Sequence, residues 1–193
     1  MDPINPLAEK WNRRHSEADG GGEPAWVLTE NIHLLSSGGR ALDLACGRGA
    51  SALVMARSGF DVTAWDISPV AIERLTSEAA TLGLEMTAET RDVVSQPPEA
   101  ASFDLILVSH FLDRSLASTI VDALRPGGLL FYQTFSQCAV SDRGPSNPDF
   151  RLADNELLTL FKALHLRFYR EERKLGDTTQ GCRDLAMLVA EKA

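Results

Sequence analysis

The chain has 193 residues, of which 44% are hydrophobic, and a formal net charge of -8 at pH 7. This length allows one substantial hydrophobic core. The acidic balance excludes the broad basic surface that neutralises phosphates along DNA or RNA, so we expect no nucleic-acid partner.

The first 39 residues are expected to form a helical lid or cap. The stretch "SEADGGGEP" at 16–24 contains three consecutive glycines, which predict a hinge after a first helical piece. Pro24 then suits the first turn of a second helix that ends near "SSGG" at 36–39. Residues 40–193 are predicted to form the main domain.

From residue 40 onward, short apolar segments alternate with helical ones. The residue types and spacing predict strands at 41–45, 61–65, 85–90, 103–108 and 129–135, with helices at 51–59, 68–83 and 112–124. Ser68 and Pro69 are a typical N-cap and first residue of a helix. The segment "RPGG" at 125–128 predicts a turn. Alternation of this kind indicates βαβ units and a mainly parallel sheet.

The last third of the chain has a different pattern. A helix is predicted at 154–164, followed by two strands at 165–174 and 183–192 that form a hairpin. The predicted fold is therefore α/β: a Rossmann-like, doubly wound and mainly parallel seven-stranded sheet with an antiparallel C-terminal β-hairpin, in three α/β/α layers.

Acidic and glycine residues lie where the predicted strands end, which is where ligands bind in open parallel sheets. Gly47 and Gly49 fall in the first such turn, and Asp66 ends the second strand, where a carboxylate can accept both hydrogens of a ribose diol. Asp92 follows the third strand, within reach of an adenine edge. Asp43 lies inside the first strand, so it must be hydrogen-bonded or paired, and we expect it to face a cationic ligand.

A dinucleotide-binding alternative comes from the same turn. Residues 47–52 fit the pattern G-x-G-x-x-A, and Asp66 follows Gly49 by 17 positions. This alternative is a nicotinamide-dependent oxidoreductase. The charged Asp43 within the strand, the "LRPGG" segment and the terminal hairpin disfavour it.

The motifs "LDLACGRG", "VTAWDIS", "RDV", "FDLILV" and "LRPGGLLFY" resemble, in order, those of class I S-adenosylmethionine-dependent methyltransferases over residues 40–135. Within that class the chain is most similar to the tellurite-resistance (TehB-type) enzymes. The resemblance implies methyl transfer from S-adenosylmethionine to a small acceptor, such as a tellurite or selenite oxyanion or a thiol, with S-adenosylhomocysteine as product. A protein that binds the cofactor without turnover is the non-enzymatic alternative.

The resemblance also implies roles for individual residues. The methionine part of the cofactor would contact Asp43, Ala45, Gly47 and Gly49. Asp66 would bind the ribose, and the adenine would contact Ile67, Asp92 and Val93. Ser109 would border the cofactor. "KWNRRHSE" at 10–17 resembles a W-x-x-R-Y element that covers the cofactor, with Trp11 at its start and His15 in place of tyrosine. Ala45 stands where the family has glycine, and its backbone can still serve provided that its φ is negative and the approach of the ligand tolerates one methyl group.

Residues for the acceptor are drawn from the segments that rim the same edge. His110 is the first candidate for a general base and His15 the second. Arg143 and Arg151 flank the loop segment "GPSNPDF", and together with Arg114 they are candidates for binding an oxyanion through their planar guanidinium groups.

Cysteine usage and the N-terminal sequence bear on compartment and partners. Cys46, Cys138 and Cys182 are widely spaced and include no CxxC pair, so we expect reduced thiols and no metal. The start "MDPINPLAEKW" lacks the features of a signal peptide, and no apolar stretch has the length needed to span a bilayer. We expect a cytoplasmic monomer or homodimer without a membrane partner.

Overall fold

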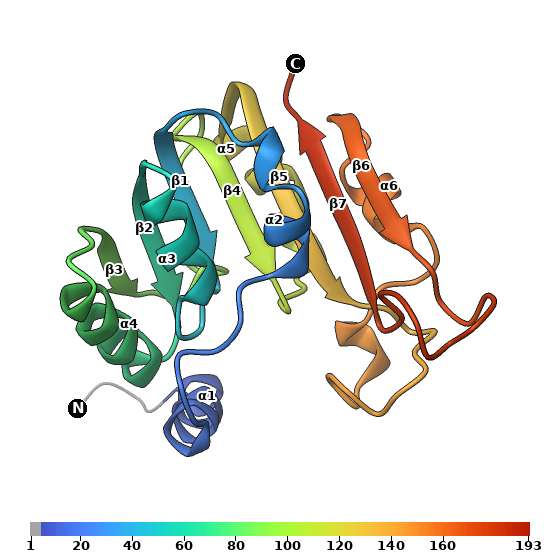
Figure 1. Cartoon of the computed structure of the whole chain (residues 1–193), viewed down its shortest axis with the longest axis horizontal. Coiled ribbons are helices and arrows are strands. Elements are labelled where there is room, and N and C mark those ends of the chain that lie inside the picture. The colour runs from blue at the N-terminus through green and yellow to red at the C-terminus, as the bar shows by residue number, and fades with distance from the viewer. Residues whose placement is uncertain (1–4) are drawn as a thin grey trace. The chain divides into compact units, whose positions relative to one another are not determined.

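A computed structural model describes residues 5–193, and the first four residues of the predicted cap lie outside this range. The chain divides into two compact units, Met1–Pro97 and Pro98–Ala193. Within the described residues, seven strands follow the order β3-β2-β1-β4-β5-β7-β6 (Figure 1). This mixed sheet with helices around it confirms the predicted fold class. The boundary expected at residue 39 stays a prediction.

The first unit contains three parallel strands, β1 (Gly39–Leu44), β2 (Phe60–Asp66) and β3 (Thr87–Thr90). Each pair is joined through a helix, α3 (Ala50–Arg57) after β1 and α4 (Pro69–Thr81) after β2. The last four residues of β1 are all buried, as expected for a strand covered on both faces. The carboxyl ends of β1 and β2 are therefore followed directly by helix N-termini.

The start of α4 forms as its sequence predicts. The Ser68 side chain accepts a hydrogen bond from the Ala71 amide, and Pro69 occupies the first helical position, where its missing N–H costs nothing. The helix buries the face that carries Ala71, Ile72, Leu75 and Ala79. This packing fixes the N-terminus of α4 beside the end of β2.

The N-terminal segment forms one full helix and two short ones. The first is α1 (Pro6–Glu17), capped by the Asn5 side chain, and none of its side chains is fully buried. The predicted second helix is wrong in its extent: α2 (Trp26–Glu30) is followed by a separate 3₁₀ turn, η1 (Ile32–Leu34). At the break, the buried Asn31 side chain donates to the Val27 carbonyl and so takes over a main-chain acceptor of the helix.

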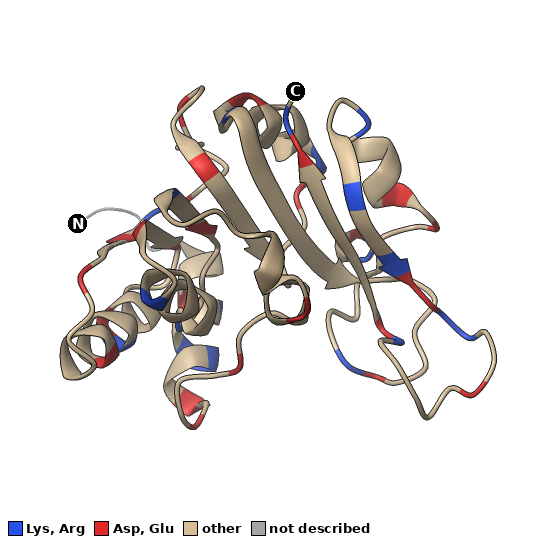
Figure 2. Cartoon of the chain, turned by 45° about the horizontal axis from the view of Figure 1, so that its top comes forward, with Lys and Arg blue, Asp and Glu red and all other residues tan. Residues whose placement is uncertain are grey.

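The second unit contains β4 (Phe103–Ser109), β5 (Leu124–Phe135), β6 (His165–Glu171) and β7 (Leu185–Glu191). β4 and β5 are parallel, whereas β7 pairs antiparallel with both β5 and β6, which confirms the predicted C-terminal hairpin. Most of the ribbon of β5 and β7 is tan in Figure 2, which marks residues other than Lys, Arg, Asp and Glu, and this agrees with the burial of both strands.

Three local predictions in the second unit differ from the structure. The "RPGG" turn lies inside β5 as an irregularity, because Gly127 and Gly128 exchange backbone hydrogen bonds with Lys192. The helix expected at 112–124 begins as a 3₁₀ turn, η2 (Arg114–Leu116), under the Asp113 cap and continues as α5 (Ala117–Ala123). The helix expected at 154–164 is reduced to α6 (Glu156–Leu160), and a 3₁₀ turn, η3 (Pro148–Phe150), precedes it.

No helix within residues 5–193 is both long enough and apolar enough to cross a lipid bilayer.

Candidate functional site

The glycine turn after β1 depends on two left-handed glycines. Gly47 has a φ of +54° and Gly49 a φ of +75°, a region that side chains other than glycine rarely adopt. A Cβ built on Gly49 would lie 2.5 Å from Cδ2 of Leu75, so α4 packs directly against this position. The turn is closed by a 2.9 Å hydrogen bond from the Gly49 amide to the Cys46 carbonyl. Glycine at 49 is therefore required by conformation and by space.

Ala45 has a backbone conformation opposite to the one expected. Its φ is +58° rather than negative. The chain thus keeps the left-handed turn that a glycine would adopt and carries the strain of a methyl group there, about 1 kcal/mol or more. The condition of a negative φ is therefore not met, because the surrounding turn, rather than the preference of an isolated alanine, sets the backbone.

Asp66 connects the glycine turn to the start of α4. Its Oδ2 accepts a hydrogen bond of 2.8 Å from the Gly47 amide, and its Oδ1 accepts one of 2.9 Å from the Ser68 amide. The residue is 7% exposed. Burial raises the pKa of this carboxyl, and the bonds from the Ser68 and Gly47 amides oppose that rise. Asp66, the residue predicted to bind the ribose, therefore lies beside the predicted glycine turn.

Asp43 is the most deeply buried acid of the site, at 2% exposure. Its Oδ2 has no hydrogen-bond partner, although the Ala52 amide bonds the carboxylate. Burial raises the pKa of Asp43 to about 7, the Ala52 amide lowers it, and the nearby Asp66 charge raises it further. A buried, unpartnered carboxylate oxygen is costly unless a ligand supplies the missing donor.

Helix α1 brings three residues to this site. His15 lies against the glycine turn, with its Cε1 3.4 Å from where a Cβ on Gly47 would be. Its ring stacks on Trp11 with centroids 5.8 Å apart, and the Ser68 hydroxyl donates to the Asn12 side chain at 2.6 Å. Burial lowers the pKa of His15, the Asp66 charge raises it, and Arg48, Arg74 and Arg14 lower it. The predicted lid element therefore lies close to Gly47, and the Asp66 charge acts on its histidine.

The residues predicted for the adenine follow β2 and β3. Ile67 is half-buried directly after Asp66, and Val93 is buried at 5% exposure. Asp92 is half-buried, and its Oδ1 accepts from the Val94 amide at 3.1 Å and caps the turn that follows. Next to them, the Arg91 guanidinium lies 3.8 Å from the centroid of the Trp65 ring. These side chains thus lie just after β2 and β3, and their contacts with an adenine stay predictions.

In the second unit, Ser109 and His110 follow the end of β4. The Ser109 hydroxyl and Nδ1 of His110 are 2.9 Å apart, and the His110 ring lies 5.0 Å from the Phe135 ring. His110 has a φ of +56°, and its amide donates to the Gln133 carbonyl. Desolvation, with a smaller contribution from the Arg143 charge, lowers the pKa of His110, which favours the neutral form of its ring.

The three arginines proposed for the acceptor have different environments. Arg114 forms a two-pronged ion pair with Glu156 and also donates to the Asp149 and Arg151 carbonyls. Arg151 donates to the carbonyls of residues 136, 143 and 145, so it organises its own loop. No side-chain hydrogen bond or ion pair of Arg143 is found within residues 5–193, although its charge acts on His110 and Asp184. Of the three, Arg143 has the guanidinium best able to take a new anion.

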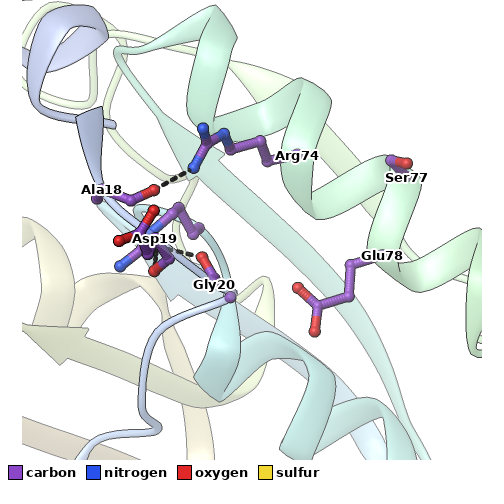
Figure 3. Close-up of a pocket in the computed structure, with 8 residues that line it drawn as sticks. Ala18, Asp19, Gly20, Arg74, Ser77 and Glu78 are labelled. Carbon is purple, nitrogen blue, oxygen red and sulfur yellow. Dashed lines mark hydrogen bonds between the residues drawn. The ribbon is translucent and has the colours of Figure 1, made fainter. Parts of the chain in front are cut away.

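Two further arginines, which the sequence analysis did not single out, also lie at the site. Arg48 lies between Gly47 and Gly49, and Arg74 lies on α4. They line a pocket of about 380 Å³, whose walls are Ala18, Asp19, Gly20, Gly21, Arg48, Arg74, Ser77 and Glu78 (Figure 3). The signals in the sequence were the charged residue inside the glycine turn and the glycine-rich hinge, but nothing local connects them.

Comparison with known proteins gives a consistent assignment. Residues 41–128 match the family described as a methyltransferase domain. The chain is 28% identical over 149 residues to a ubiquinone biosynthesis O-methyltransferase of Xanthomonas axonopodis pv. citri, an alignment that covers 71% of this chain and 61% of that protein. This chain thus spans about three fifths of that curated relative.

Two solved structures have the same fold. The crystal structure of TehB from Haemophilus influenzae superimposes with a TM-score of 0.70 at 21% identity, covering 96% of this chain and 67% of that one. A structure reported for the conversion of a disulfide bond into a thioacetal group during echinomycin biosynthesis also has a TM-score of 0.70 at 21% identity, covering 96% and 93% of the two chains. Residues 41–128 therefore match a methyltransferase domain, and the chain has the fold of S-adenosylmethionine-dependent methyltransferases.

Proposed function

We propose that this chain transfers a methyl group from S-adenosylmethionine to a small acceptor. The observation that carries this proposal is the partnerless Oδ2 of Asp43 beneath the glycine turn. An ammonium group such as that of the cofactor's methionine part would supply the missing donor and the compensating positive charge. A dinucleotide offers no cation of this kind at the same position.

The other residues of the first unit fit the remaining parts of the cofactor. The left-handed turn at 45–49 exposes main-chain groups without bulky side chains. The Asp66 carboxylate accepts backbone hydrogen bonds from Gly47 and Ser68 and interacts with the Ile67 amide; a carboxylate has about four acceptor sites, so it can also bind a ribose hydroxyl. Ile67 and Val93 supply apolar contacts for an adenine, and Asp92 an acceptor for its amino group.

The bound cofactor supplies the electrophilic methyl group, which its sulfonium carries. The protein then has to orient the acceptor in line with that group and exclude water. Good orientation contributes up to roughly 7 to 11 kcal/mol to such a reaction. A thiol or a chalcogen oxyanion loses its proton near neutral pH, so with these acceptors the protein needs no dedicated base.

The acceptor that we propose is a small thiol or chalcogen oxyanion, for which Arg143 provides an available guanidinium. A hydroxyl acceptor is the second candidate. It is favoured by the neutral ring of His110 beside Ser109, which can accept a proton, and by the O-methyltransferase name of the curated relative. His15 is the alternative base.

Calorimetric titration with S-adenosylhomocysteine tests cofactor binding, with NAD as the comparison ligand. We expect measurable heat with the first and none with the second. Asp43→Asn should weaken binding by about tenfold or more, because an amide cannot balance an ammonium charge. Binding of NAD alone would support the oxidoreductase instead, and no binding of either ligand would contradict the proposal.

Transfer of a labelled methyl group to tellurite, selenite, a simple thiol and a catechol tests the acceptor. His110→Gln separates the two candidates. With the catechol as acceptor, kcat should fall by about 10²-fold or more in this variant, whereas a thiolate should react at nearly the wild-type rate. Cofactor binding without transfer to any member of the panel would favour a non-catalytic binding protein.

A further inference from the structure

Helix α1 lies at the cofactor site with one half-buried face, made by Ala8, Trp11, Asn12 and His15. None of its side chains is fully buried. A helix of 12 residues is marginal in water on its own, and most helices are stabilised by a buried apolar face. Polar contacts after its C-terminal end therefore add to the partial burial of this face in holding α1 in place.

Arg74 provides one of these contacts, at the C-terminal end of α1. From α4, its Nη1 donates to the Ala18 carbonyl at 2.7 Å (Figure 3). Its Nη2 donates to the Ser16 carbonyl at 3.1 Å. The last carbonyls of a helix have no partner within the helix and attract positive charge. A planar guanidinium can satisfy two of them at once.

Arg48 provides a second contact from within the glycine turn. Its Nη1 donates to the Asp19 carbonyl at 2.5 Å and also to the Gly20 carbonyl. The hinge runs close to Glu78 of α4 and to Arg48: a Cβ on Gly21 would lie 2.5 Å from Oε2 of Glu78, and one on Gly22 would lie 3.5 Å from Arg48. Glycine at 21 and 22 thus lets the chain pass close to both side chains.

We propose that Arg48 and Arg74 are positioning residues that clamp the backbone at 16–20 and thereby hold His15 of α1 against the cofactor site. This inference rests on the proposed function for its effect on ligand affinity. His15 precedes the first clamped residue, Ser16, and contacts Gly47, the neighbour of Arg48. The clamp therefore couples the glycine turn to the helix above it.

The charges of the two arginines give the clamp a second consequence. Arg48 and Arg74 each lower the pKa of His15, in the same direction as its burial. A neutral imidazole is compatible with a sulfonium cation nearby, whereas an imidazolium would repel it. The residues that hold α1 in place thus also favour the uncharged form of its histidine.

The test uses Arg74→Gln in the full-length chain, with Arg13→Gln as a matched control. Arg13 is exposed on the same helix, and its replacement removes the same charge. Without ligand, amide hydrogen exchange over 6–17 should rise about tenfold in Arg74→Gln and stay unchanged in the control. S-adenosylhomocysteine should bind about five- to tenfold more weakly to Arg74→Gln, and the Tm should differ little from that of the control.

A double mutant tests whether Arg74 acts through His15. If it does, His15→Ala should cost little additional affinity in the Arg74→Gln background, and Arg74→Lys should restore part of the binding. The clamp would be overturned if the amides of α1 exchanged at the wild-type rate in Arg74→Gln. It would also be overturned if the losses of binding free energy from Arg74→Gln and His15→Ala were fully additive. If the wild-type protein does not bind S-adenosylhomocysteine, the proposed function fails, while the exchange measurement still decides whether the arginines hold α1.

Discussion

The Asp66 carboxylate accepts a hydrogen bond of 2.8 Å from the amide of Gly47, which lies 19 residues earlier in the chain. Its second oxygen holds the Ser68 amide at the start of α4. The side chain proposed to bind the ribose therefore also closes the glycine turn. Replacing Asp66 must consequently affect the shape of the turn together with the affinity for ligand.

Asp66→Asn tests this double role. One of the two backbone amides would face an NH₂ group instead of an acceptor. We therefore expect the free energy of unfolding to fall by about 1 to 3 kcal/mol. The affinity for S-adenosylhomocysteine should fall about 10- to 100-fold, as measured by calorimetry. Asp61→Asn on the same strand, at an exposed position, should leave both quantities unchanged. An Asp66→Asn protein with wild-type affinity would contradict the proposed ribose contact.

The pKa of Asp43 predicts a pH dependence of ligand affinity. In the free protein this pKa is about 7, so the carboxyl is largely protonated at pH 6. An ammonium ligand needs the carboxylate, and we therefore expect affinity for S-adenosylhomocysteine to rise about tenfold from pH 6 to pH 7.5. Titrations across this range should show the rise in the wild type and a flat profile in Asp43→Asn. A flat profile in both proteins would argue against contact between Asp43 and the ligand.

The same group predicts the opposite pH trend for the stability of the free protein. Its folded-state pKa of about 7 lies above the roughly 3.9 of an unfolded aspartate. The stabilising contribution is thus complete below about pH 4 and is lost as the pH rises through 7. Relative to Asp43→Asn, the wild type should become steadily less stable over this range in urea unfolding. A constant difference between the two proteins would mean that burial does not raise the pKa.

Gly49→Ala should destabilise the protein for two separable reasons. The alanine would have to adopt a left-handed backbone conformation, and its Cβ would also overlap the Leu75 side chain. Together these effects should cost about 3 kcal/mol. Gly83→Ala is the matched control, since Gly83 has a φ of +66° and nothing lies within 4 Å of where its Cβ would be. It should cost only about 1 kcal/mol, so equal losses in chemical denaturation would rule out the close packing of α4 on the turn.

Ala45→Gly is expected to stabilise the chain. The φ of +58° at Ala45 is strained for alanine and free of strain for glycine, so the gain should reach about 1 kcal/mol. Ala56→Gly, within α3, should instead lose about 1 kcal/mol because its backbone is helical. If both substitutions destabilise the protein equally, the left-handed turn at residue 45 is not present in solution.

The sequence by itself determined the fold class and the location of the glycine turn. Apolar periodicity places strands near their observed positions, and the Ser68-Pro69 pair and Gly49 mark the starts of α4 and α3. These signals are readable because each depends on the backbone preferences of a few consecutive residues. Asn31 shows the limit of this reasoning, since its side chain ends α2 through a bond that apolar periodicity does not encode.

Only the tertiary structure decided the backbone of Ala45, the protonation of Asp43 and the contacts of Arg48 and Arg74. Arg74 and Ala18 are 56 positions apart, and Arg48 and Gly20 are 28 apart, so no local pattern brings them together. The pKa of Asp43 depends on how completely the fold excludes water around it. Burial and long-range contacts arise when the elements pack, because they depend on distances between residues that the sequence separates.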